Sequence, residues 1–168
     1  LIFSMFSVLF PGQGSQSVGM AKELYDNFDY VKDIFNEAND ILNLSISSII
    51  FDGPKESLDQ TENTQPAIFL VSYSIFNVIK NESKFDIDNA DFFAGHSLGE
   101  YSALTCAGVI NFKETIKLLK IRGNAMQNAV PKNEGCMVAV LGEELKKIEE
   151  VIENNKAKYS CFLANDNS

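Results

Sequence analysis

The sequence has little of what several classes of protein require. Its 168 residues include one His and three Cys, with no CxxC pair, so neither a multi-histidine metal site nor a zinc or disulfide framework is expected. The apolar run at residues 1–10 is interrupted by two serines, and Pro11 ends it well short of the roughly 20 residues of a membrane helix. It also lacks the cationic start of a signal peptide.

The charge balance is acidic, with 14 Lys plus Arg against 23 Asp plus Glu and a net charge of −9. A general nucleic-acid binder needs a positive field, so that class is disfavoured. Hydrophobic residues make up 45% of the chain, which excludes an intrinsically disordered protein. The chain begins with Leu1 and ends at Ser168 directly after an apolar run. We therefore expect a processed product, or a natural or engineered fragment of a longer protein.

Hydrophobic periodicity predicts alternating strands and helices, which is the pattern of an α/β fold. Four short apolar runs predict strands at residues 5–10, which we expect to be buried, and at 90–96, 136–141 and 159–164. Helical spacing predicts helices over 25–44, 67–79, 98–107, 112–129 and 143–154. Thr64 is a candidate N-cap, with Pro66 in the first turn of its helix. A boundary near Pro131 would separate a second, smaller α/β unit.

Gly95 to Gly99, read as Gly-His-Ser-Leu-Gly, fits the pattern G-x-S-x-G between a predicted strand and a predicted helix. Such a serine sits on a tight turn where neighbouring side chains would collide, which explains the two glycines. The Leu98 N–H at the helix start would supply one oxyanion donor. A chance match is the alternative, because three fixed positions at about 7% each give roughly a 5% expectation in a chain of this length.

A nucleophilic serine needs a base within hydrogen-bond reach, and the sequence offers no obvious one. His96 is adjacent to Ser97, and adjacent residues of a turn point in different directions, so we expect His96 to pack under the turn. No other His is present. The base is therefore either another residue type or a residue outside this chain.

Two further features could serve the same site. The glycine-rich loop at residues 10–14 follows a predicted strand, and it could supply the second oxyanion donor or be an ordinary tight turn. Arg122 is the single arginine, and a guanidinium binds a carboxylate with two parallel hydrogen bonds, which Lys cannot do. Arg122 shares a helical face with Met126. A surface arginine near a helix end is the alternative.

Four motifs then occur in an order that resembles one family. They are Phe10-Pro11-Gly12-Gln13-Gly14-Ser15-Gln16, Thr64-Gln65-Pro66-Ala67, Gly95 to Leu104, and Arg122-Gly123 with Met126-Gln127. Together they resemble the malonyl-CoA:acyl-carrier-protein transacylases of type II fatty acid synthesis, over essentially the whole chain. The resemblance implies an α/β-hydrolase-like core with an inserted ferredoxin-like small subdomain. Residues 1–131 would be the N-terminal part of the core, and 132–168 the incomplete start of the subdomain.

The resemblance also implies a role for each matching residue. Ser97 would be the catalytic nucleophile that carries malonyl as an ester, and the backbone N–H groups of Gln13 and Leu98 would form the oxyanion hole. The residues that would bind substrate are Arg122, for the malonyl carboxylate, and Met126 and Gln65, for the acyl pocket. The partners implied are malonyl-CoA and acyl carrier protein, with no cofactor, metal, nucleic acid or membrane. The family's catalytic histidine lies well downstream of the serine, so we expect this chain to end before it.

Three functional interpretations stay open at this point: malonyl transfer, a serine hydrolase or an acyltransferase for another acyl group, and an inactive carrier-protein-binding fragment. Arg122 separates the first two, because an uncharged acyl pocket has no use for a buried guanidinium. Lys far exceeds Arg, and Asn, Ile and Phe are abundant, which indicates an AT-rich genome. The expected compartment is a plastid-type organelle such as an apicoplast, with a bacterial cytoplasm as the alternative.

Overall fold

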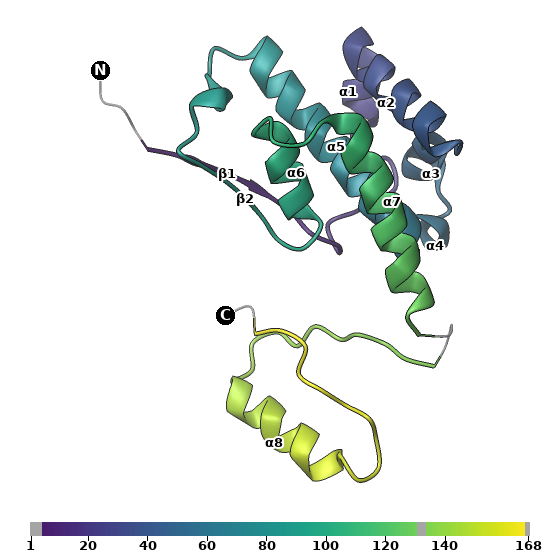
Figure 1. Cartoon of the computed structure of the whole chain (residues 1–168), viewed down its shortest axis with the longest axis vertical. Helices are drawn as coiled ribbons and strands as arrows, with labels where there is room; N and C mark the ends of the chain where they lie inside the picture. The colour runs from purple at the N-terminus through teal and green to yellow at the C-terminus, as the bar shows by residue number, and fades with distance from the viewer. Residues whose placement is uncertain (1–4, 131–133, 167–168) are drawn as a thin grey trace. The chain divides into compact units, whose positions relative to one another are not determined.

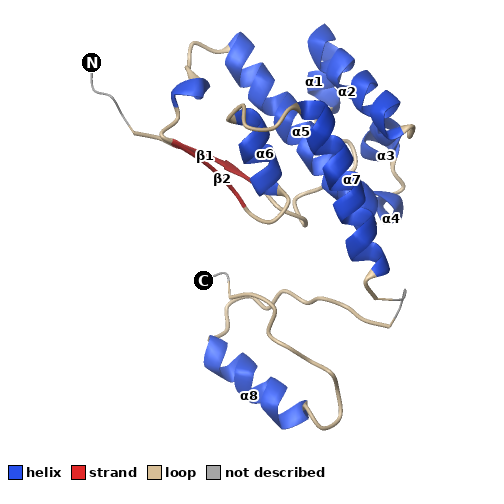
Figure 2. Cartoon of the chain, in the orientation of Figure 1, coloured by secondary structure: helices blue, strands red, loops and turns tan. Residues whose placement is uncertain are grey.

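A computed structural model describes residues 5–130 and 134–166 of the chain. It divides the chain into two compact units, Leu1–Lys132 and Asn133–Ser168. The larger unit is an α/β fold in which helices outnumber strands (Figures 1 and 2). The assignment of the two units to a hydrolase-like core and a ferredoxin-like subdomain stays a prediction.

Two parallel strands form the sheet of the larger unit. Strand β1 (Ser7–Phe10) pairs with β2 (Phe92–Gly95), with Ser7 opposite Phe92 and Phe10 opposite Gly95. Both strands lie where the sequence predicts them. The expectation that the first strand is buried is wrong, because the exposed fraction of Leu9 is 74%. Alternate side chains of a strand point to opposite faces, and here only the face bearing Phe10 is well covered by the larger unit.

The connection between the two strands contains a short helix described below and five α-helices: α1 (Lys22–Asn27), α2 (Asp29–Leu42), α3 (Ile46–Asp52), α4 (Lys55–Leu58) and α5 (Thr61–Glu82). The predicted single helix over 25–44 is interrupted at Phe28, whose backbone is extended with φ −125° and ψ 116°. The Phe28 side chain packs against the main core and lies 5.6 Å from the ring of Tyr30. Periodicity did not predict this break in the helix, which occurs where the Phe28 side chain packs against the core.

Helix α5 runs through the middle of the larger unit, where it contacts α2, α6 and α7 (Figure 1). Its central residues are buried on most sides, as predicted. The predicted cap is wrong: Gln60 is the N-cap, and Thr64 lies one turn inside the helix. The Thr64 hydroxyl donates instead to the carbonyls of Leu58 and Gln60, at 2.6 and 3.1 Å. Pro66 is consequently inside the helix and not in its first turn.

The second half of the larger unit contains the short helix η1 (Ile87–Asn89), α6 (Gly99–Cys106) and α7 (Phe112–Asn128). Helix α6 packs on both strands, and α7 packs along α5. Gly108 follows α6 with φ +77°, a conformation that favours glycine and ends the helix as predicted. Asn111 caps α7 by accepting the Glu114 N–H at 2.9 Å. Helix α7 ends at Asn128, before Pro131 as predicted, and Pro131 itself lies outside the described residues.

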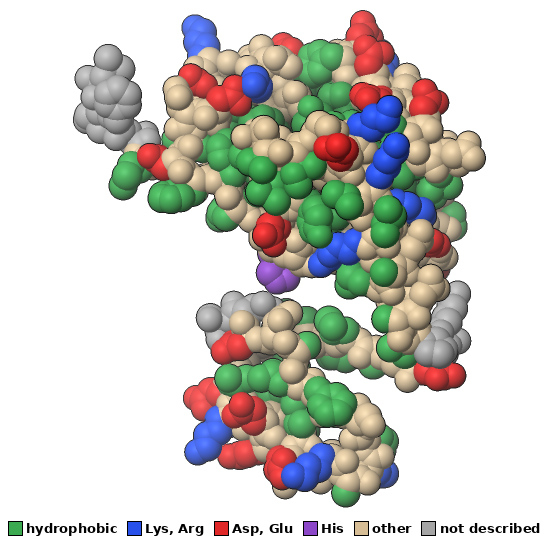
Figure 3. Space-filling model, viewed as in Figure 1, with side chains coloured by type: hydrophobic (Ala, Val, Ile, Leu, Met, Phe, Trp, Pro, Cys, Tyr) green, Lys and Arg blue, Asp and Glu red, His purple; other side chains and the backbone are tan. Residues whose placement is uncertain are grey.

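The smaller unit contains one helix, α8 (Leu145–Asn155), where the sequence predicts one. The predicted strands at 136–141 and 159–164 are wrong, since the structure has irregular backbone there. A strand needs a hydrogen-bonded neighbour, and neither run pairs with a described segment. Many hydrophobic side chains of this unit are visible on its surface (Figure 3). Across both units, every helix among the described residues is too short or too polar to cross a bilayer.

Candidate active site

The turn that carries Ser97 connects the end of β2 to the start of α6. Ser97 has φ 55°, in the left-handed region that costs a non-glycine residue roughly 1–2 kcal/mol. A Cβ on Gly95 would lie 2.0 Å from the carbonyl carbon of Gly99, and a Cβ on Gly99 would lie 2.4 Å from the Phe10 carbonyl oxygen. Both positions therefore admit only glycine, which is the steric reason predicted from the motif. Within this turn the strained residue is Ser97, whose side chain is exposed.

The glycine-rich loop after β1 lies beside this turn. The His96 N–H donates to the Phe10 carbonyl at 3.2 Å, and a Cβ on Gly12 would lie 2.7 Å from His96 Nδ1. The expectation that His96 packs under the turn is wrong, because its side chain is exposed and lies against the loop. Within residues 5–130, neither the Gln13 N–H nor the Leu98 N–H donates a hydrogen bond. Within this range, both N–H groups are therefore free to bind a ligand. They follow the carboxyl ends of the two parallel strands, which is where α/β folds bind their ligands.

The guanidinium of Arg122, on α7, reaches the Ser97 hydroxyl. Nη2 donates to Ser97 Oγ at 3.0 Å, and Nη1 donates to Gln65 Oε1 at 2.7 Å. The guanidinium carbon also lies 5.9 Å from the ring centroid of Tyr101, within the range of a cation–π contact. A cation beside Oγ favours any negative charge that develops there or on a group attached to it.

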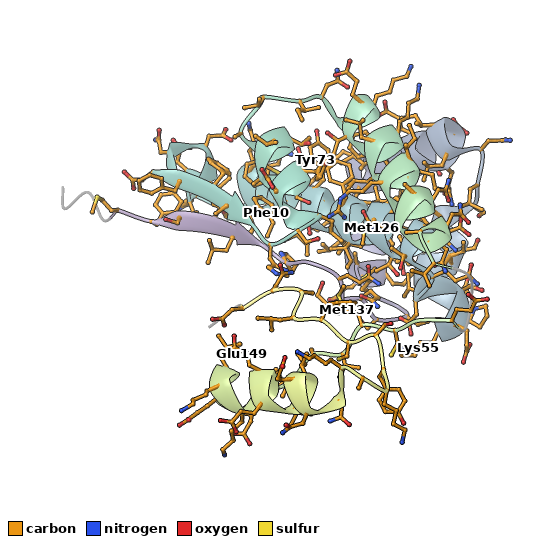
Figure 4. All side chains as sticks on the ribbon, turned by 60° about the horizontal axis from the view of Figure 1, so that its bottom comes forward. Phe10, Lys55, Tyr73, Met126, Met137 and Glu149 are labelled. Carbon is orange, nitrogen blue, oxygen red and sulfur yellow. The ribbon has the colours of Figure 1, made fainter. Side chains whose placement is uncertain are left out.

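Gln65 and Met126 complete this cluster. Gln65 on α5 is fully buried, and its Nε2 lies 3.1 Å from Met126 Sδ. Met126 projects from α7 and is labelled in Figure 4. The structure thus brings together all four side chains predicted for nucleophile and substrate. The Gln65 amide bonds to both Arg122 and Met126, so it orients the guanidinium, and its place in an acyl pocket stays a prediction.

Close packing of α7 on the first turn of α5 sets this geometry. A Cβ on Gly123 would lie 2.7 Å from Glu62 Cα and 2.8 Å from the Thr61 carbonyl oxygen. One turn earlier, Lys120 Nζ lies 3.4 Å from Glu62 Oε2; one turn later, Gln127 Oε1 accepts the Thr61 N–H at 3.3 Å. Sequence reasoning missed Tyr101 and Gly123 as parts of the site. Their only signal is membership of the serine and arginine motifs.

No base for Ser97 is found within residues 5–130, where no imidazole or carboxylate is hydrogen-bonded to Oγ.

The other described features of the larger unit offer no second reactive site. The partly buried Cys106 is not a candidate nucleophile, because burial and the Asp88 carboxylate raise the pKa of its thiol to about 12. The described residues hold no cluster of three or more His, Cys, Asp or Glu able to bind a metal. An apolar cavity of about 430 Å³ lies between β1, α5 and η1, and no titratable side chain lines it.

Comparisons with known proteins show which family the chain resembles. The family model described as acyl transferase domain matches residues 7–166. Malonyl CoA-acyl carrier protein transacylase of Bacillus subtilis strain 168 is 43% identical over 148 residues, which are 88% of this chain and 45% of that protein. Its counterpart in Salmonella typhimurium is 41% identical over 165 residues, 98% of this chain and 52% of that protein. The chain thus spans about half the length of the curated relatives it matches.

Solved structures of related enzymes are similar over most of the chain. The acyl-carrier-protein-S-malonyltransferase of Bartonella henselae is 43% identical with a TM-score of 0.87, over 97% of this chain and 52% of that one. A malonyl-transacylase in complex with a type II PKS acyl-carrier protein is 41% identical with a TM-score of 0.81, over 90% of this chain and 48% of that one. A family model that covers nearly all of the sequence, on an α/β fold shared with these enzymes, leads to one conclusion: the chain belongs to the acyl transferase domain family.

Proposed function

We propose that Ser97 transfers a malonyl group from malonyl-CoA to the phosphopantetheine thiol of an acyl carrier protein. In the first half-reaction, Oγ attacks the thioester carbonyl, the C–S bond breaks, and CoA leaves as its thiol with the serine proton. In the second, the carrier thiol attacks the ester carbonyl, the C–Oγ bond breaks, and Ser97 recovers a proton. The N–H groups of Gln13 and Leu98 stabilise the oxyanion of both steps. The names of the relatives and the carrier-protein complex support the donor and the acceptor.

The contact between Arg122 and Ser97 carries this proposal. Nη2 lies 3.0 Å from Oγ, so a carboxylate one carbon beyond the ester carbonyl is within reach of the guanidinium. Malonyl has its carboxylate at that position. A serine hydrolase for neutral esters would gain nothing from a cation there, so this alternative is less well supported. We assign Gln65 and Met126 to the acyl pocket because Gln65 accepts a hydrogen bond from the Arg122 guanidinium, and Met126 Sδ lies against the Gln65 amide.

The general base of this proposal lies outside residues 5–130. Because the chain covers only 45% of the Bacillus subtilis relative, we propose a histidine in the remaining length of the complete protein. The named relatives come from bacteria, which supports fatty acid synthesis in a bacterial cytoplasm over an apicoplast.

Covalent labelling tests the nucleophile. The complete protein, mixed with malonyl-CoA, should gain one malonyl group on Ser97 by mass spectrometry. Ser97→Ala should abolish the adduct, whereas Ser48→Ala, at an exposed serine of α3, should leave it intact. An adduct of normal yield in Ser97→Ala would remove the proposed nucleophile.

Arg122 separates malonyl transfer from the alternatives. Arg122→Ala should lower kcat/KM for malonyl-CoA by roughly a hundredfold or more, because a charged partner of the substrate is lost. Transfer of acetyl should fall little or rise. Arg122→Lys should rescue poorly, because an ammonium cannot make two parallel bonds. An equal fall for malonyl and acetyl would show that Arg122 is structural.

A further inference from the structure

The loop from Pro11 to Gln16 has no strand or helix to hold it, although it carries the Gln13 N–H. Two of its own side chains bond to its backbone instead. Ser15 Oγ donates to the Gly12 carbonyl at 2.9 Å, and Gln16 Oε1 accepts the Gly14 N–H at 2.8 Å. Gly14 has φ +110°, a backbone conformation that residues other than glycine rarely adopt, so the loop is tightly folded here.

These two bonds act on the peptide groups on either side of Gln13. The Gly12 carbonyl and the Gln13 N–H belong to one planar trans peptide, in which C=O and N–H point in opposite directions. The bond from Ser15 to the Gly12 carbonyl therefore fixes the direction of the Gln13 N–H. The bond from the Gly14 N–H to Gln16 fixes the following peptide. A rotation of either peptide would break a hydrogen bond.

Gln16 also ties the loop to the rest of the larger unit. Its Nε2 donates to Asp59 Oδ1 at 2.9 Å, and Asp59 pairs in turn with Lys55. The Lys55 ammonium and the Gln16 amide together lower the pKa of Asp59, so the accepting group is a carboxylate. Hydrogen bonds to a charged acceptor are the stronger kind. A weaker second tie runs from Gln13 Nε2 to Thr61 Oγ1 at 3.4 Å.

We propose that Ser15 and Gln16 are positioning residues that hold the Gln13 N–H toward the reacting carbonyl oxygen, with Asp59 as the anchor. The inference rests on the proposed function, in which that N–H is an oxyanion donor. Neither side chain touches substrate in this proposal. Both act through the backbone, so their loss should slow acylation while substrate binding is retained.

The test measures acylation of Ser97 by malonyl-CoA in single turnovers of the complete protein. Removing one oxyanion donor typically costs about 100- to 1000-fold in rate, so loss of its orientation should cost roughly 10- to 100-fold. We expect this fall in the acylation rate constant for Ser15→Ala and Gln16→Glu, with the malonyl-CoA concentration that gives half the maximal rate changed less than about threefold. Ser15→Thr keeps the hydroxyl and should retain most of the rate. Asn89→Ala removes an exposed amide–carboxylate bond to Asp86 far along the chain and serves as the matched control.

A charge-exchanged pair provides the rescue. Gln16→Glu keeps an oxygen for the Gly14 N–H but places a carboxylate against Asp59. Adding Asp59→Asn restores a donor opposite that carboxylate, so the double variant should regain most of the lost rate. Slow acylation without rescue would overturn the role of the Gln16–Asp59 bond, and wild-type rates in Ser15→Ala and Gln16→Glu would overturn the inference as a whole. Because Ser15→Ala deletes only one exposed hydroxyl, it keeps the test decisive even where Gln16→Glu impairs folding. Absence of any Ser97 adduct in the wild-type protein would instead overturn the proposed function.

Discussion

The two units of the chain differ in what becomes of their apolar side chains. In the larger unit, Phe35, Phe69 and Leu119 are completely removed from solvent. In the smaller unit, no residue among 134–166 is buried, and the exposed fractions of Leu141 and Phe162 are 89% and 83%. The composition of the two sequences does not explain this contrast, because both contain apolar runs and amphipathic helices.

The contrast shows that periodicity predicts a helix without predicting a core. Helix α8 carries a stripe of Leu145, Ile148 and Ile152 at helical spacing, yet these side chains are only partly buried. Helix α2 has the same kind of stripe, and its Val31, Phe35 and Ala38 are buried because α3, α5 and α7 pack against it. Helical stability in proteins comes mainly from such tertiary packing.

The largest expected effect is on the stability of the two units. Phe35→Ala should lower the free energy of unfolding of the 168-residue chain by about 3–5 kcal/mol, because it removes a ring packed against Tyr25 and Phe51. Phe162→Ala, at an exposed ring, should change it by less than about 0.5 kcal/mol. Denaturant unfolding followed by circular dichroism gives both values. An equal loss in the two variants would show that the smaller unit has a core of its own.

The rate of cysteine alkylation gives a second comparison of the two units. The thiols of Cys136 and Cys161 are exposed, whereas burial and Asp88 raise the pKa of Cys106 to about 12. Since the thiolate is the reactive form, iodoacetamide at pH 8 should modify Cys106 on the order of a thousandfold more slowly than a thiol of ordinary pKa. Peptide mapping after timed quenching provides the rates. The slow thiol should react quickly once urea unfolds the larger unit, and equally fast labelling without urea would contradict its burial.

The raised pKa of Cys106 also makes the stability of the folded chain depend on pH. The folded chain keeps Cys106 protonated, whereas the unfolded chain ionises it above its ordinary pKa of about 9.0. Stability is therefore unaffected below that pH and falls as pH rises toward 12. Cys106→Ala should remove this part of the alkaline destabilisation, measured as the difference in unfolding free energy between pH 8 and pH 10.

Much of the larger unit could be predicted from the sequence because its signals are local. The amphipathic run over residues 112–129, the Gly-Ser-Gly turn at 95–99 and the two strands all lie where the patterns place them. The break at Phe28 and the shifted start of α5 depend on contacts between distant segments, which no local pattern contains. The strands predicted in the smaller unit did not form because a strand requires a partner that periodicity cannot supply.

The candidate site divides in the same way. Ser97 follows from a local motif, whereas its contact with Arg122 joins residues 25 positions apart, and the contact of Arg122 with Gln65 joins residues 57 apart. Physical reasoning from the residues could only call Arg122 a candidate carboxylate binder. The family resemblance placed it near the serine. The anchoring of Gln16 on Asp59, 43 residues away, had no signal in the sequence beyond the loop motif.

The smallest expected effect concerns two glycines, one in each unit. A Cβ at Gly123 would meet the backbone of Thr61 and Glu62, which cannot give way as a flexible side chain would, whereas a Cβ at Gly142 would meet nothing within 4 Å. Overpacking costs typically about 1–3 kcal/mol, and the higher helix propensity of Ala offsets up to about 1 kcal/mol of that. Gly123→Ala should therefore destabilise the larger unit by roughly 1–2 kcal/mol in denaturant unfolding. It should also move Arg122 away from Ser97, so that malonyl transfer by the complete protein falls more than acetyl transfer.

Gly142→Ala is the control in the smaller unit. It places a side chain at φ +73°, which strains the backbone only locally. The unfolding of the larger unit and the ratio of malonyl to acetyl transfer should both stay unchanged. Equal responses to the two substitutions would mean that close packing of α7 on α5 does not set the position of Arg122.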